Sequence, residues 1–497
     1  MISVYLEGHD FSYEVYELLR MFYANEEIEF IESIEEYKDN GTLIESFLKK
    51  TDDDYFCIAK VIENGVCISE HKISSIKSID IKKDSIKKKI KNGIKKCIYE
   101  AVSPISTIEV PWGILTGVRP LKIVHDLMDK GFDEDAILKV LCDEYKLFPE
   151  KAKLIIQIGK KQRNYIYPLD NDRFSLYVSI PFCPTRCVYC SFPSNSVHDA
   201  GKYIDEYTEK IIDEIYQVGE LMKDKKIHTV YVGGGTPTAI PKENLDKIIK
   251  SIYRTFGKDN IKEITVEAGR PDTINKEMLS MLKENGVNRI SINPQTMNLE
   301  TLKIIGRKHT PEDIINAYSI AKEVGFETIN MDIIAGLPSE GIAEIKNTLE
   351  QISKLNPENL TVHTLAIKRA SKFKERIEEF STPKQTVLNS MLNLAREYSS
   401  MMDLEPYYLY RQKHMLGNFE NIGYAKKGKE CIYNILIMEE KETIMAVGAG
   451  AISKIFYPRE NRLERVPNVK NLMDYLNRTA EMVERKKKYI DTIIFIL

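Results

Sequence analysis

Leu176–Pro193, LYVSIPFCPTRCVYCSFP, carries three cysteines on one short loop: Cys183, Cys187 and Cys190. An alternating, strand-like run precedes the loop, and Pro181 ends that run. Three thiolates at this spacing can bind three irons of a cubane iron–sulfur cluster, because sulfur is the soft ligand that iron prefers in such clusters. The loop itself supplies no fourth ligand. The fourth iron would therefore stay open as a site for chemistry.

Two other uses of these cysteines fit the sequence less well. Zinc would need a fourth Cys or His at ligand spacing, and His198 is the only nearby candidate. A disulfide framework is typical of small secreted chains, not of 497 residues with eight scattered cysteines. The sequence therefore favours the cluster, and the aromatic side chains of Tyr189 and Phe192 are expected to shield it from water.

The CxxxCxxC spacing, with an aromatic residue before the last cysteine, resembles the radical S-adenosylmethionine (SAM) enzymes. The longer run 177–192 is similar to the oxygen-independent coproporphyrinogen III oxidase family, in which YxxIPFC precedes the cluster. The resemblance implies two cofactors, a 4Fe–4S cluster and SAM bound at its open iron.

The charge balance excludes a bulk electrostatic attraction to nucleic acid. The chain has 71 basic and 74 acidic residues and a net charge of −3. Its lysine-rich stretch 82–96 fits an amphipathic helix with a solvated basic face. The sequence opens without a basic signal-peptide start and has no apolar run approaching about 18 residues, so no membrane span is expected. Unpaired thiols at cluster spacing need a reducing compartment, which predicts a cytoplasmic protein.

Hydrophobic periodicity divides the chain into three parts. We expect an N-terminal accessory α+β domain at 1–165, an α/β core at 170–370 and a small C-terminal α+β region at 371–497 that covers the substrate. In the core, six strands alternate with helices, which predicts parallel strands, right-handed crossovers and an open, partial (β/α)6 barrel. The expected strands are 175–180, 228–233, 263–267, 289–293, 328–334 and 360–365, and the helices between them are 201–223, 242–256, 275–284, 311–324 and 341–355.

The flanking parts mix strands and helices. In the first, the expected strands are 2–6, 28–31, 55–62 and 65–71, with a hairpin turn at 63–65, and the expected helices are 85–99, 121–130, 133–144 and 149–165. In the last, we expect a helix at 383–401 and paired strands at 434–438 and 443–447. The stretch GAGA (448–451) is expected to form a turn that approaches its neighbours closely.

Polar residues follow the ends of the predicted core strands, where ligands bind in folds of this kind. GGGTP (233–237) follows the second strand, and its bare backbone can approach a ligand closely. In this context it matches the GGxTP motif, which in radical SAM enzymes contacts the methionyl amino group. The other polar residues at strand ends are Glu267, Gln295, Arg307, His309 and Asp332.

Taken residue by residue, the resemblance implies a set of SAM contacts. The positions that match family contacts to the cluster-bound SAM are Tyr177, Gly234, Gly235, Thr236 and Glu267. Gln295, Arg307, Asp332 and Ala366 fall where the family binds SAM, including a second SAM molecule, and Ile452 falls at a further family contact.

A segment rich in Tyr, Arg, Lys and Asn, 407–434, suits an amphipathic planar substrate with acidic arms. Aromatic rings can stack on such a molecule, and Arg411 and Lys413 can bind carboxylates. A polar surface with ordinary tyrosines explains the same segment equally well. Arg119, in the loop VPWGILTGVRP (110–120), is a further candidate for a carboxylate. With GVRP and GAGAIS, this segment resembles the HemZ branch of the family, so that the resemblance covers nearly the whole chain.

The resemblance implies oxidative decarboxylation of coproporphyrinogen III to protoporphyrinogen IX, a step of porphyrin and heme biosynthesis, with an external one-electron donor such as a flavodoxin or ferredoxin. One position departs from the family pattern: the oxidase carries a further Cys where Phe192 stands here. Heme chaperones of the same superfamily also lack that Cys. A heme-binding chaperone, with axial ligands among His309, His363 and His414, and another radical SAM reaction on a tetrapyrrole therefore stay open as alternatives.

Overall fold

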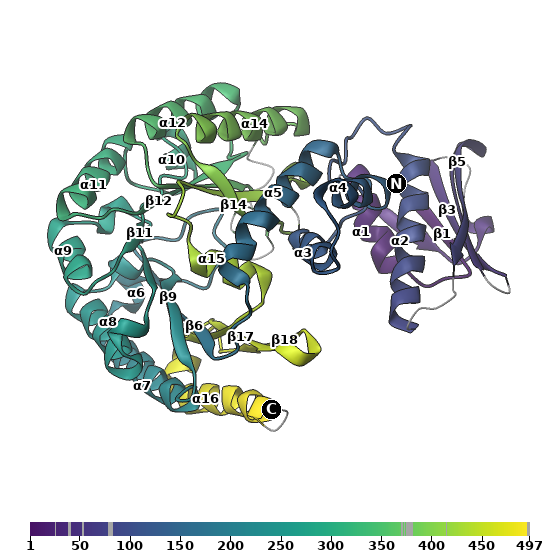
Figure 1. The fold of residues 1–497 in the computed structure, drawn as a ribbon. Coiled ribbons are helices and arrows are strands. Elements are labelled where there is room, and N and C mark those ends of the chain that lie inside the picture. Colours follow the sequence, from purple (N-terminus) through teal and green to yellow (C-terminus); the bar gives the residue numbers. More distant parts are fainter. Residues whose placement is uncertain are drawn as a thin grey trace. The chain divides into compact units, whose positions relative to one another are not determined.

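The computed structural model describes residues 1–24, 26–37, 41–51, 54–77, 83–368, 371, 373, 381–413 and 415–494 (Figure 1). The chain forms two compact units. The first contains Met1–Gln157 and Gly417–Phe419, and the second contains Ile158–Leu416 and Glu420–Leu497.

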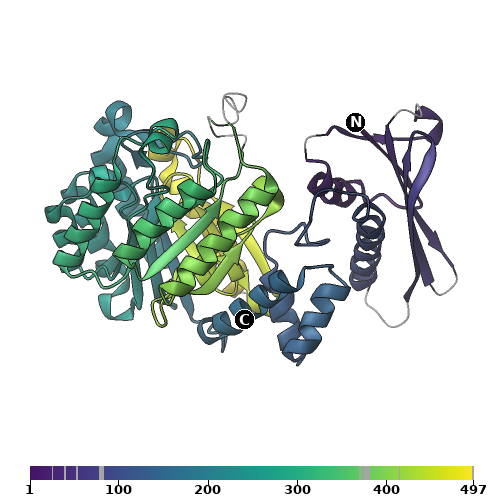
Figure 2. The same cartoon turned by 90° about the horizontal axis from the view of Figure 1, so that it is seen from above.

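The first unit is built on a five-stranded sheet in the order β2-β1-β3-β4-β5. Its strands are β1 (Ile2–Glu7), β2 (Ile28–Ile31), β3 (Thr42–Lys50), β4 (Asp54–Glu63) and β5 (Val66–Lys77), and its first two helices are α1 (Ser12–Phe22) and α2 (Lys83–Val102). Both helices lie on the same face of the sheet (Figure 2). The hairpin at 63–65 is confirmed, because Glu63 pairs with Val66 and both Asn64 and Gly65 have positive φ.

Three more helices follow in sequence: α3 (Leu121–Asp129), α4 (Glu134–Asp143) and α5 (Pro149–Ile166). All three were expected within one or two residues of these bounds. Asp133 caps α4 by accepting a hydrogen bond from the Ala136 N–H at 2.8 Å. The sequence missed β3 and α1, because neither has a clean apolar period.

The second unit contains an eleven-stranded sheet whose centre is parallel. The parallel strands are β6 (Arg173–Ile180), β9 (Lys226–Gly234), β10 (Glu263–Glu267), β11 (Arg289–Ser291), β12 (Ile329–Ala335) and β13 (Asn359–Thr364). The sheet curves into an open arc with helices on its outer side (Figure 1). These helices are α7 (Ile204–Leu221), α8 (Lys242–Phe256), α9 (Lys276–Glu284), α11 (Pro311–Val324) and α12 (Ile342–Leu355). The predicted partial parallel (β/α)6 barrel is thus confirmed.

The sheet is wider than six strands, because residues beyond 400 extend both of its edges. At one edge β15 (Asn421–Ala425) pairs antiparallel with β13, and β14 (Glu405–Tyr410) follows it. At the other edge β16 (Thr443–Val447) pairs in parallel with β6, and β17 (Ile452–Tyr457) and β18 (Arg462–Pro467) continue the sheet.

The expected pairing of strands 434–438 and 443–447 is wrong. Residues 434–438 lie in helix α15 (Ile432–Glu439), and β16 pairs with β6 instead. The helix begins there because the Glu263 carboxylate accepts hydrogen bonds from the N–H groups of Ile432 and Tyr433, at 3.0 and 3.1 Å. In Figure 1, α15 lies on the inner side of the arc.

Four further helices complete the described part of the chain: α6 (Val197–Ala200), α10 (Leu299–Ile304), α14 (Gln385–Met401) and α16 (Leu472–Ile494). The long helices α14 and α16 pack on α12 and α7, respectively. Within the described residues, we find no helix with both the length and the apolar character that crossing a bilayer requires.

Candidate functional site

The three cysteines lie on a loop that is fixed at both ends. Two short strands, β7 (Phe182–Cys183) and β8 (Asn195–Ser196), pair in parallel and close the loop. In its middle, the Val188 N–H donates to the Ile305 carbonyl at 3.0 Å, and the Val188 carbonyl accepts from the Phe373 N–H at 3.0 Å. All three thiols are free; Cys187 is buried, and Cys183 and Cys190 are partly exposed.

The surroundings of the thiols fit a sulfur-bound cluster. Burial raises the pKa of Cys183 to about 11 and also raises the pKa of Cys190. The pKa of Cys187 is lowered, because the positive charges of Arg307 and Arg270 outweigh the effect of its burial. The described residues hold no group of three His, Cys, Asp or Glu side chains placed to bind one metal ion. In a cubane cluster, by contrast, each cysteine binds a separate iron atom.

The glycine-rich turn after β9 lies directly against the cysteine loop. The Gly235 N–H donates to the Ile180 carbonyl at 2.8 Å, and the Thr236 N–H donates to the Phe182 carbonyl at 2.7 Å. A Cβ on Gly235 would lie 2.6 Å from the Phe182 carbonyl oxygen and 3.0 Å from the Cys183 sulfur. Gly235 is therefore required by close packing, and the Thr236 hydroxyl donates to the Cys183 sulfur at 3.5 Å.

A half-buried carboxyl, Glu267, is the last residue of β10. The Tyr231 hydroxyl donates to its Oε1 at 2.7 Å. Burial, with a smaller contribution from the charge of Asp332, raises the pKa of Glu267 to about 7, while the hydrogen bond from Tyr231 opposes the rise. Glu267 therefore changes charge near neutral pH.

A second carboxyl, Asp332, stays ionised. Burial alone would raise its pKa, but the hydrogen bond and charge of His363 and the hydrogen bond of Asn330 lower it. The His363 Nε2 lies 3.7 Å from the Asp332 Oδ2, and the Asn330 amide donates to the Oδ1 at 2.7 Å. The other ring nitrogen of His363 lies 3.2 Å from the Tyr410 hydroxyl.

Gln295 and Arg307 donate hydrogen bonds to backbone carbonyls on neighbouring strands or just after them. Gln295 has a φ of 66°, unusual for a residue other than glycine, and its N–H donates to the Asp332 carbonyl at 2.9 Å. Arg307 is buried, and its guanidinium donates to the carbonyl oxygens of Asn293 and Gly269. Tyr177, Glu267 and Asp332 thus lie on β6, β10 and β12, and both Tyr177 and Asp332 lie near Glu267. Gln295 follows β11, and Arg307 lies near Cys187 of the cysteine loop.

Comparison with known proteins gives the family. Residues 177–352 match the family model described as the radical SAM superfamily. The oxygen-independent coproporphyrinogen-III oxidase-like protein HemZ of Bacillus subtilis (strain 168) is 38% identical over 451 residues, which cover 90% of this chain and 89% of the relative. The chain belongs to this radical SAM family.

Two other similarities bear on the radical SAM core. The heme chaperone HemW of the same Bacillus subtilis strain is 29% identical over 303 residues, which cover 61% of this chain and 76% of the relative. The solved structure of coproporphyrinogen III oxidase (HemN) from Escherichia coli, a radical SAM enzyme, matches this chain with a TM-score of 0.52 and 22% sequence identity. The match covers 64% of this chain and 72% of the HemN chain. HemN shares the fold. Membership of the radical SAM family implies a 4Fe–4S cluster and SAM as cofactors.

Stacked tyrosines line the inner side of the radical SAM sheet. The rings of Tyr177, Tyr231 and Tyr433 stack on one another, with centroids 4.7 Å apart for Tyr231 and Tyr433 and 6.2 Å for the other two pairs. Tyr433 comes from α15, and its buried hydroxyl has no hydrogen-bond partner among the described residues. These rings form a wall next to Glu267.

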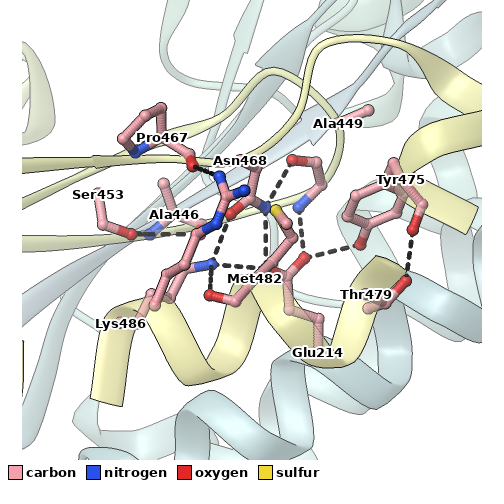
Figure 3. A network of polar contacts seen from close by, with 12 residues as sticks. Glu214, Ala446, Ala449, Ser453, Pro467, Asn468, Tyr475, Thr479, Met482 and Lys486 are labelled. Carbon is pink, nitrogen blue, oxygen red and sulfur yellow. Dashed lines mark hydrogen bonds and ion pairs between the residues drawn. The ribbon is translucent and has the colours of Figure 1, made fainter. Parts of the chain in front are cut away.

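The predicted contacts from the last part of the chain lie on different elements. Ala366 forms an isolated bridge with Met415, and Ile452 is the partly exposed first residue of β17. The turn before Ile452 is fixed to the end of β6, because the Ser179 hydroxyl donates to the Ala449 carbonyl at 2.9 Å. A buried network around Glu214 holds the same turn from the other side (Figure 3).

The three candidate substrate residues are divided between the two compact units. Arg411 is buried, and burial lowers its pKa to about 10 against the opposing charge of Glu420. Lys413 is exposed, and Arg119 lies in the other compact unit. His414 lies outside the described residues. His309 is buried with neither ring nitrogen bonded among the described residues, and burial, with the charges of Arg307 and Arg270, lowers its pKa to about 4.

Three residues of the site were not found from the sequence: Arg270, Tyr231 and Tyr433. Tyr231 had a usable signal, because it stands two residues before Gly233 on the predicted strand and so faces the same side. Tyr433 lies in the tyrosine-rich segment 407–434, one residue before the predicted strand 434–438, and nothing there marks it apart from the other tyrosines. Arg270 sits in VEAGRPDT, three residues after Glu267, and nothing in that stretch alone marks it as a neighbour of Cys187.

Proposed function

We propose that this protein catalyses the oxygen-independent oxidative decarboxylation of coproporphyrinogen III to protoporphyrinogen IX, as part of porphyrin and heme biosynthesis. One observation carries the proposal: the stacked wall of Tyr177, Tyr231 and Tyr433 adjoins Glu267, and Tyr177 lies on β6, the strand that leads into the cysteine loop. An aromatic wall of this kind suits the face of a tetrapyrrole. The similarity to the HemZ relative over nine tenths of the chain supports the same substrate class.

When bound, the cluster and SAM supply one-electron chemistry that removes a hydrogen atom from an unactivated carbon. In each round, one propionate side chain loses a β-hydrogen atom, carbon dioxide and one electron and becomes a vinyl group. An external donor such as a flavodoxin or ferredoxin provides the electron that starts a round, and a one-electron acceptor takes the electron that the substrate gives up. We place the protein in the cytoplasm because its thiols need reducing conditions.

The chain's own residues bind and orient the reactants. Cys183, Cys187 and Cys190 would hold the cluster, and the backbone at Gly234–Thr236 would bind the amino end of SAM. The carboxylates of Glu267 and Asp332 would accept hydrogen bonds from SAM, and Arg307 would bind a carboxylate. Gln295, Ala366 and Ile452 would complete the SAM contacts, including those to a second SAM molecule. Residues 371–497 would cover the substrate on the radical SAM core at 170–370, with Arg411 and Lys413 as candidates to bind its acidic arms. Residues 1–165 would form an accessory domain, in which Arg119 is a further candidate for a carboxylate.

The test is an anaerobic assay of the reconstituted full chain with dithionite, SAM and coproporphyrinogen III. The proposal predicts that carbon dioxide and 5′-deoxyadenosine form together. Release of 5′-deoxyadenosine without carbon dioxide would instead support another radical SAM reaction on a tetrapyrrole. The control is the Asp332→Ala protein, which we expect to bind SAM more weakly, so both products should fall together in it.

A second candidate function is heme binding by a chaperone-like protein. Phe192 favours it, because this side chain is 60% exposed at the position where the family oxidase carries a further Cys. The similarity to HemW points the same way. Stoichiometric heme retention without decarboxylation, lost on replacement of His309 or His363, would support this function over the oxidase.

A further inference from the structure

Arg270 directs a buried guanidinium at the cysteine loop. The residue follows β10 and is only 3% exposed. Its Nε and Nη2 donate to the two carboxylate oxygens of Asp272 at 2.9 and 2.8 Å. This two-point contact fixes the plane of the guanidinium. Its remaining nitrogen, Nη1, donates to the Thr185 hydroxyl at 3.2 Å and lies 3.7 Å from the Cys187 sulfur.

Cys187 receives positive charge from two directions. The charge of Arg307, which follows α10, also acts on this thiol, and its guanidinium is buried as well. Cys183, by contrast, has the neutral Thr236 hydroxyl as its nearest polar neighbour. Arg186 and Arg307 also act on Cys190, but Cys187 is the ligand thiol whose pKa is lowered by its neighbouring positive charges.

We propose that Arg270 is a positioning residue that anchors the Cys187 segment and, through its charge, raises the reduction potential of the iron–sulfur cluster. A reduced cluster carries one more negative charge than an oxidised one. A cation beside a ligating sulfur, in a site shielded from water, stabilises the reduced form more. The role concerns how easily the cluster accepts an electron, so it holds whichever substrate the enzyme uses.

The test is a redox titration of the anaerobically reconstituted full chain, followed by electron paramagnetic resonance. Arg270→Gln keeps a hydrogen-bonding amide and removes the charge. We expect its iron content per chain to be unchanged and its midpoint to be more negative. At a fixed potential the ratio of reduced to oxidised cluster should fall at least tenfold, which for a one-electron couple corresponds to a shift of about 59 mV.

A second variant moves the charge the other way. Asp272→Asn removes the negative charge that partly neutralises Arg270, so its midpoint should become more positive. Arg270→Lys retains the positive charge but loses the two-point contact of the guanidinium with Asp272. Its midpoint should therefore stay nearer to that of the unchanged chain. Arg254→Gln, an exposed residue in the last turn of α8, is the matched control and should leave the midpoint unchanged.

Either of two variants, Arg270→Gln and Asp272→Asn, can overturn the proposal. An Arg270→Gln midpoint that is unchanged or more positive would overturn it. If Arg270→Gln fails to take up iron, the Asp272→Asn protein decides: a positive shift supports the charge role, and no shift or a negative shift overturns it. A purely structural role would reduce iron loading in both variants without opposite shifts of the midpoint.

Discussion

The Lys486 ammonium lies 2.7 Å from the Glu214 Oε1, and both side chains are completely buried (Figure 3). Glu214 belongs to α7 and Lys486 to the C-terminal helix α16. The same carboxylate accepts hydrogen bonds from the Asn468 amide at 2.8 Å, the Tyr475 hydroxyl at 2.7 Å and the Gly448 N–H at 2.8 Å. One buried carboxylate thus holds α16 and the turn before Ile452 against the core.

Replacing Lys486 with Met should therefore destabilise the second unit. The change leaves the Glu214 carboxylate buried without its counter-charge, which typically costs about 3–5 kcal/mol. The measurement is thermal and urea unfolding of the cluster-free chain. The double variant Glu214→Leu with Lys486→Met should recover much of the loss. Arg478→Ala, which breaks an exposed pair with Glu481, is the control and should leave the stability nearly unchanged.

Cys187→Ala should abolish iron loading, because it removes one of three ligands on the cysteine loop. Iron and sulfide content after anaerobic reconstitution measures the effect. Cys67→Ala is the matched control, since Cys67 is exposed and lies on β5 of the first unit. A Cys187→Ala protein with a full complement of iron would show that the cluster ligands are assigned wrongly.

Most of the core fold could be predicted because its signals are local. The six parallel strands and the helices between them follow from changes in hydrophobic period, and α8 and α11 have the expected bounds. Helix α15 could not be predicted, since its first N–H groups are satisfied by Glu263, which lies 169 residues from Ile432. The apolar run at 432–438 has no period of its own, so tertiary contacts decide its conformation.

The site residues that could be predicted are likewise those whose signal is local in the sequence. The cysteine loop, the glycine turn and the carboxyls at strand ends are continuous motifs and were named from the sequence. Arg270 and Cys187 are 83 residues apart, and Glu214 and Lys486 are 272 residues apart. Such pairs meet only through the fold, so a single sequence carries no signal for them.

Gly235→Ala should impair both SAM binding and cluster loading. The added Cβ would lie 2.6 Å from the Phe182 carbonyl oxygen and 3.0 Å from the Cys183 sulfur, so either the loop or the turn must shift. Iron content and equilibrium dialysis with labelled SAM measure the two effects. Gly201→Ala is the control, because its Cβ would meet only the Val197 Cγ1, at an ordinary 3.7 Å. Equal behaviour of the two variants would contradict the close packing.

Asp332→Ala should leave the iron content per chain unchanged and weaken SAM binding by at least tenfold. Asp332 lies on β12 next to Gln295 and is not one of the three cysteine ligands, and its charge is maintained by His363. Asp332→Asn keeps the size and one acceptor oxygen, so its loss of affinity should be smaller. Affinity is measured by dialysis on protein with a confirmed iron content. Unchanged SAM affinity in Asp332→Ala would remove this residue from the site.

SAM affinity should rise with pH through the titration of Glu267. Its pKa is raised to about 7, so the side chain is neutral below that pH and a carboxylate above it. If binding needs the carboxylate, apparent affinity increases about tenfold from pH 6 to pH 8, following the ionised fraction. The Glu267 carboxyl also has other titratable neighbours, which are Tyr231, Asp332, His363, Tyr177 and Tyr433. The pH dependence of SAM affinity must therefore be compared with that of a variant in which Glu267 alone is changed.

Glu267→Gln is that variant, because glutamine keeps the shape of the side chain and cannot ionise. Its SAM affinity should be flat between pH 6 and pH 8. The same titration acts on stability: a carboxyl whose folded pKa is above its unfolded value favours the folded state at low pH, and that advantage is lost as pH rises from about 4.5 to about 7. Glu267→Gln should therefore be stabilised relative to the unchanged chain above pH 7 and not below pH 4.5. A pH dependence of SAM binding that survives in Glu267→Gln would assign the titrating group elsewhere.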